Sequence, residues 1–132
     1  MNNNKAKVIT VYPLVSGNGA NFIATNIANA LKIEYGDKKK IALVDFDFKK
    51  PFLAHSLTEF DDVHGIDNLT DKIDGGVLTN ELFLENMIQM KNNVSLLKGT
   101  KMLGKYRNFS SKHVATIIDI LRDNYDFVVI AV

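Results

Sequence analysis

The chain has 132 residues, of which 46% are hydrophobic and 23% are charged, and its formal net charge is +1. This length suits one domain with its own core, and the near-neutral charge argues against a dedicated nucleic-acid or anionic-membrane surface. The absence of cysteine excludes disulfides and thiolate metal sites, and no apolar run approaches the ~20 residues of a membrane-spanning helix. Because the start MNNNKAK is polar rather than signal-like, we expect a cytoplasmic protein.

Apolar strands and amphipathic helices alternate along the sequence. This pattern predicts an α/β fold with a doubly wound, mostly parallel sheet of four recognisable strands and helices on both of its faces. The expected elements are a strand at 7–12, a helix at 20–35 that stops at Gly36, a strand at 41–44, a short helix near 67–73, a helix at 79–90, a strand at 94–97, a helix capped by Ser110 or Ser111, and a strand at 127–132. Because no polar tail follows the last apolar strand, we expect a fragment of a longer protein.

The segment between the first strand and the long helix has the form of a phosphate-binding loop. Its glycines let successive backbone N–H groups turn toward one anion, and the helix that follows aims its positive end at the same place. The residues expected to bind a cofactor phosphate in this way are Ser16, Gly17, Asn18, Gly19, Ala20 and Asn21. A Walker A loop reads G-x-x-x-x-G-K-[ST], and its lysine and hydroxyl are missing here.

The loop and its helix resemble the deviant Walker A motif of the ParA/MinD superfamily, K-G-G-x-G-K-[ST], followed by a helix of the type T-I-A-x-N-L-A. In that alignment Val15 takes the place of the signature lysine and Ala20 that of the catalytic lysine. Asn21 takes the place of the hydroxyl that binds Mg²⁺. The resemblance implies a family member whose catalytic side chains have been replaced, so we expect no catalytic residue and no ATPase activity.

Four later segments resemble the same family in the same order. They are Asp45-Phe46-Asp47 with Pro51, Gly65 to Leu69, Val94 to Gly99, and Asn124 to Ile130, where Ala131 occupies the place of the Walker B aspartate. The resemblance therefore covers 1–132 and implies a single P-loop NTPase-like domain that lacks the family's C-terminal strands, with its last strand beside its first. The run from Asp45 through Pro51 to Leu57 is most similar to the TadZ/CpaE and FlhG-like branch, in which irregular Walker A loops occur.

Two carboxylates, Asp45 and Asp47, are the candidate metal ligands. Two carboxylates at a strand's end could bind Mg²⁺. Alternatively they are only solvated or cap a turn, which we favour because Asn21 and Ala131 remove two other supports of the metal site. The three histidines lack metal-ligand spacing, and Phe22, Phe46, Phe48 and Phe52 are expected in the core or in an interface.

We expect the absence of the two Walker A lysines to weaken ATP binding. A hydrogen bond to a charged partner contributes roughly 1.5–3 kcal/mol, so loss of two lysine contacts costs about 3–6 kcal/mol, or on the order of 10²–10⁴ in affinity. We therefore expect no firmly bound cofactor, with weak binding of ATP or ADP and Mg²⁺ as the alternative.

Three functions remain open at this point. The first is a homodimer that self-associates across residues 14–21 and binds protein partners of a secretion, pilus or partition apparatus, in placement or assembly of a cell-surface structure. The second is a weak ATPase switch of the partition type, in which Lys49 or Lys50 replaces the lost lysines. The third is a decayed gene product without activity of its own.

Overall fold

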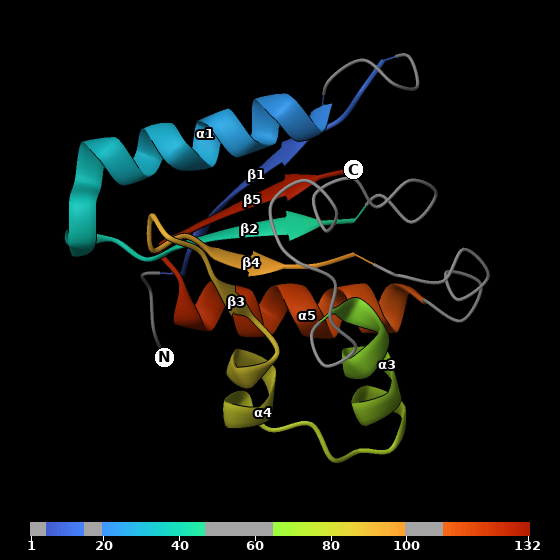
Figure 1. Ribbon diagram of the computed structural model, residues 1–132. Coiled ribbons are helices and arrows are strands. Elements are labelled where there is room, and N and C mark those ends of the chain that lie inside the picture. The colour runs from blue at the N-terminus through green and yellow to red at the C-terminus, as the bar shows by residue number, and fades with distance from the viewer. Residues whose placement is uncertain (1–4, 15–19, 47–64, 100–109) are drawn as a thin grey trace.

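The computed structural model describes residues 5–14, 20–46, 65–99 and 110–132. In chain order the elements are β1 (Lys7–Val11), α1 (Ala20–Tyr35), the 3-10 turn η1 (Gly36–Lys38), β2 (Ile41–Asp45), α3 (Ile66–Asp74), α4 (Asn80–Glu85), β3 (Ile88–Gln89), β4 (Ser95–Leu97), α5 (Ser111–Asn124) and β5 (Phe127–Ala131). The strands form one sheet in the order β1-β5-β2-β4-β3, with α1 above it and α5 below it in Figure 1. The predicted α/β fold with helices on both faces is therefore confirmed.

The central strand β2 is buried on both faces. Ile41 and Leu43 pack toward α1, whereas Ala42 and Val44 belong to the cluster on the α5 side. This period-2 division explains why the predicted strand reads as a continuous apolar run. The neighbouring β5 lies parallel between β1 and β2, so the last strand sits beside the first as the resemblance implies.

The helices α1 and α5 pack on opposite faces of the sheet. Ala24 and Ala28 of α1 are fully buried one turn apart, and their small side chains let the helix lie close to β2 and β5. On the other face, Ile117 and Leu121 of α5 are fully buried against the sheet. Gly36 ends α1 with a φ of +58°, a left-handed conformation that glycine adopts at low cost.

The predicted helix at 79–90 is wrong in its second half. α4 ends at Glu85, and Ile88 and Gln89 form β3, antiparallel to β4, so the sheet has five strands rather than four. The buried side chain of Asn86 donates to the carbonyl of Gly65 at 2.8 Å, which draws the chain away from the helix. Pairing with β4 thus overrides the helical spacing of the apolar residues.

Candidate functional site

The candidate phosphate loop connects two elements that meet at one edge of the sheet. β1, β5, β2 and β4 are parallel, so their carboxyl ends lie together, and α1 begins at that edge (Figure 1). Residues 16–19 lie outside the described residues, and Ala20 and Asn21 form the start of α1. A strand and a helix joined by a short connection therefore flank the candidate loop. That its residues bind a phosphate remains a prediction.

Three strand ends line up across this edge. The parallel register pairs Val11 with Ala131 and Ala131 with Asp45, and the Phe46 N–H donates to the Ala131 carbonyl at 2.8 Å. Ala131, which stands where the ParA/MinD family has the Walker B aspartate, therefore lies directly beside Asp45. Its methyl group can neither coordinate a cation nor accept a hydrogen bond.

Asp45 is fully buried, so the expectation that it is merely solvated is wrong. Gly99 packs against it so closely that a Cβ built on Gly99 would lie 3.1 Å from the Cγ and Oδ2 atoms of Asp45 and 3.2 Å from its carbonyl oxygen. A carboxylate without water is stable only where charged or polar groups compensate it. The carboxyl end of β2 is thus a tightly packed polar site.

Several residues near the end of β2 were not predicted as site residues from the sequence. Lys98 is only 1% exposed although it carries a charge, and its carbonyl accepts from the Ile66 N–H at 3.0 Å. Gly65, with a φ of +129°, lies against the carbonyls of Lys98 and Gly99, and its own carbonyl accepts from Asn86. A lysine next to a glycine at the end of an apolar strand was the available signal for this cluster.

Of the two predicted Mg²⁺ ligands, the structure describes only Asp45. Asp45 is a single carboxylate enclosed by Gly99, and Ala131 adds no ligand. Among residues 5–14, 20–46, 65–99 and 110–132, no group of three histidine or acidic side chains could hold a metal. The second predicted ligand, Asp47, lies outside the described residues, as do Lys49 and Lys50.

His113 has a structural position rather than a catalytic one. Its Nδ1 accepts from the Ser110 N–H at 2.9 Å, and the Ser110 hydroxyl accepts from the His113 N–H at 3.4 Å, which closes a capping box at the start of α5. Because Nδ1 is an acceptor, Nε2 carries the proton in the neutral ring and donates to Asp74 at 2.6 Å. His55 and His64 lie outside the described residues.

Apolar side chains flank the candidate loop on both sides. Leu14, which precedes the loop, is 97% exposed, and Phe22 in the first turns of α1 is 70% exposed. Tyr12 and Ile23 next to them are exposed as well. Phe46 is buried in the core, so of the two described phenylalanines in question only Phe22 fits an interface. Isolated exposed apolar residues are ordinary, but a group beside a candidate site suggests a contact surface.

Comparison with known proteins gives a match in structure but none in sequence. Neither a family model nor a curated protein matches the sequence. The fold is similar to a ParA family ATPase from Chlorobium tepidum, with a TM-score of 0.79 and 20% identity over 97% of this chain and 51% of that one.

Two further solved structures have a similar fold. The septum site-determining protein MinD from Pyrococcus horikoshii, complexed with Mg-ADP, gives a TM-score of 0.73 at 20% identity over 95% of this chain and 48% of that one. A plasmid partition protein from Borrelia burgdorferi gives 0.58 at 19% identity over 96% and 55%. The chain thus spans about half the length of these proteins. Its described part has the fold of the ParA/MinD-type P-loop NTPases.

Proposed function

We propose that this chain is a catalytically degenerate relative of the ParA/MinD ATPases that acts in placement or assembly of a cell-surface apparatus such as a pilus. It works through self-association and protein partners rather than through ATP hydrolysis. Proteins of the same fold include one named for septum-site determination and one for plasmid partition. The TadZ/CpaE-like pattern from Asp45 to Leu57 supports the pilus branch of this proposal.

The pairing of Ala131 with Asp45 carries the proposal. In a phosphoryl-transfer site, lysine and metal ions neutralise the charge that develops on the phosphoryl oxygens. Here a methyl group lies beside the buried carboxylate, and Ala20 and Asn21 open α1 where the family has lysine and a hydroxyl. The helix end and backbone N–H groups alone would bind an anion modestly.

The exposed residues beside the loop supply the surface for self-association. Leu14 and Phe22 bracket residues 15–21, and burying each would remove an apolar side chain from water. Full burial of such a side chain contributes roughly 1.5–3 kcal/mol. Two copies that meet across this surface bury four of them, which favours a homodimer.

Sedimentation velocity over a range of concentrations tests the self-association. The chain should shift from monomer to dimer as concentration rises, and Leu14→Asp with Phe22→Asp should keep it monomeric. Ile33→Asp is the matched control, because Ile33 is 86% exposed at the far end of α1 and should not matter. A monomer at every concentration, with nucleotide and without it, would contradict the proposal.

A weak nucleotide switch of the partition type is the second candidate. The MinD structure of the same fold is complexed with Mg-ADP, which makes nucleotide binding the natural competitor. Calorimetry with ATP and Mg²⁺ separates the two functions. Binding tighter than about 100 μM, or about 5.5 kcal/mol, that disappears in Lys49→Ala would favour the switch.

A further inference from the structure

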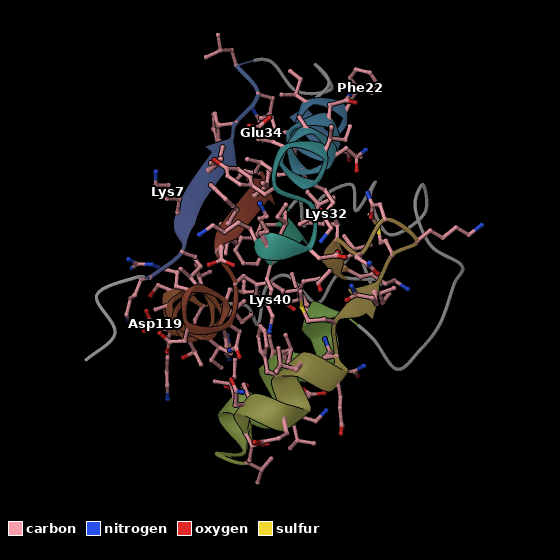
Figure 2. The ribbon with its side chains drawn as sticks, turned by 90° about the vertical axis from the view of Figure 1, so that its left-hand side faces the viewer. Lys7, Phe22, Lys32, Glu34, Lys40 and Asp119 are labelled. Carbon is pink, nitrogen blue, oxygen red and sulfur yellow. The ribbon has the colours of Figure 1, made fainter. Side chains whose placement is uncertain are left out.

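A pocket lies at the opposite edge of the sheet from the candidate loop. Its volume is about 450 Å³, within the range of small-molecule sites. Its wall includes Ile41 and Ser95, the first residues of β2 and β4, so it opens at the amino ends of the strands. Figure 2 faces this edge, and it labels Lys32 and Lys40 beside the end of α1. Most of its lining lies outside the segments that resemble the ParA/MinD family; Ser95, Asn124 and Tyr125 belong to two of them.

The charges around the pocket are unbalanced. Lys32, Lys39 and Lys40 line it together with a single acidic residue, Asp37. The carboxylate of Asp126 lies next to the lining, because its Oδ2 accepts from the Lys40 N–H at 2.8 Å. Three positive charges therefore face two negative ones. The Lys32 side chain is only 13% exposed, and its Nζ lies 3.6 Å from the Oδ1 of Asp37, whose side chain is 90% exposed. Because that carboxylate is mostly solvated, it compensates the shielded ammonium weakly.

One of the three lysines is already stabilised by the C-terminal end of α1. Lys32 lies in the last turn of the helix, where the carbonyl groups favour a cation. Lys39 and Lys40 follow η1 and belong to no helix. Within the part of the chain that the structure describes, neither of them forms an ion pair. Their two charges are therefore available to a ligand.

The remaining wall offers oriented polar groups. The Ser95 hydroxyl donates to the side-chain carbonyl of Gln89 at 2.9 Å, and Tyr125 belongs to the same wall. Burial raises the pKa of Tyr125, so its hydroxyl stays protonated at neutral pH. Asn93 forms the adjacent hairpin turn with a φ of +66°. Neutral hydrogen-bonding groups beside two free ammonium groups suit a small polar anion rather than an apolar ligand.

We propose that this pocket binds a small molecule of the phosphate-monoester class, held by Lys39 and Lys40. The ammonium groups of Lys39 and Lys40 can each donate to a phosphate oxygen. The site is separate from the candidate loop, so it would let an anionic metabolite bind whether or not the loop holds a nucleotide.

Titration of the full chain with glycerol 3-phosphate, followed by ¹H–¹⁵N NMR at constant ionic strength, tests the proposal. Saturable shifts are expected at the backbone amides of Gln89, Asn93 and Ser95. Lys39→Ala combined with Lys40→Ala should weaken binding by about tenfold, because two exposed cations are lost. Lys38→Ala combined with Lys91→Ala removes two exposed lysines that do not line the pocket and should leave the affinity unchanged.

The outcomes are distinguishable from those of the proposed function. Shifts confined to residues 12–14 and 20–23 would place the anion at the candidate loop and overturn the pocket proposal. Shifts that do not saturate, or that weaken equally in both lysine pairs, would overturn it as a general charge effect. Self-association across Leu14 and Phe22 is measured independently of either result.

Discussion

Replacement of Gly99 by alanine tests the packing at the end of β2. The added Cβ would lie 3.1 Å from two side-chain atoms of Asp45 and 3.2 Å from its carbonyl oxygen, closer than ordinary van der Waals contact. Asp45 is fully buried, so it cannot swing into solvent to relieve the contact. Overpacking of this kind costs about 1–3 kcal/mol.

Chemical denaturation of Gly99→Ala measures this loss directly. A decrease of about 1–3 kcal/mol in the free energy of unfolding corresponds to a melting temperature lower by roughly 3–15 °C for a domain of this size. Gly75→Ala is the matched control, because the nearest atom to its Cβ is 3.4 Å away and its φ of −77° suits any residue. Equal stability of the two variants would refute the close approach of Gly99 to Asp45.

Two further substitutions follow from the hydrogen bonds described above. His113→Ala removes the capping box of α5 and the bond to Asp74, so we expect the free energy of unfolding to fall by about 1–2 kcal/mol, and unchanged urea denaturation would contradict this. Burial raises the pKa of Tyr125 above its ordinary value of 10.0, so the native state holds this proton more tightly than the unfolded state and loses stability as the pH rises above about 10. Tyr125→Phe should flatten that loss in thermal melts across this range, and identical slopes for the two proteins would count against it.

The sequence predicts most of the sheet because the evidence for each long element is local. The helix from Ala20 to Tyr35 has apolar periodicity and a glycine stop, and both bounds are confirmed. The two-residue strand at Ile88 and Gln89 could not be foreseen in this way. It exists because Asn86 reaches Gly65, 21 residues away, and because β4, which follows after a short turn, offers a partner.

The candidate site was predictable in outline but not in its packing. The motif resemblance named Asp45 and Ala131 separately, and the parallel register brings them side by side. Burial of Asp45 and Lys98 depends on two strands and on the Gly65 turn at once. Neither local pattern nor composition contains that information, because it arises only when the segments meet.

Hydrolysis of ATP is the most direct test of the central claim that the ATPase chemistry has been lost. Phosphate release should be measured with saturating ATP and Mg²⁺, at protein concentrations where self-association is observed. We expect no release above that of a protein-free blank, because in the proposed alignment Ala20, Asn21 and Ala131 stand where the family has the groups that stabilise the transferring phosphoryl. Release that rises with protein, saturates with ATP and is lost in Lys49→Ala with Lys50→Ala would contradict the account.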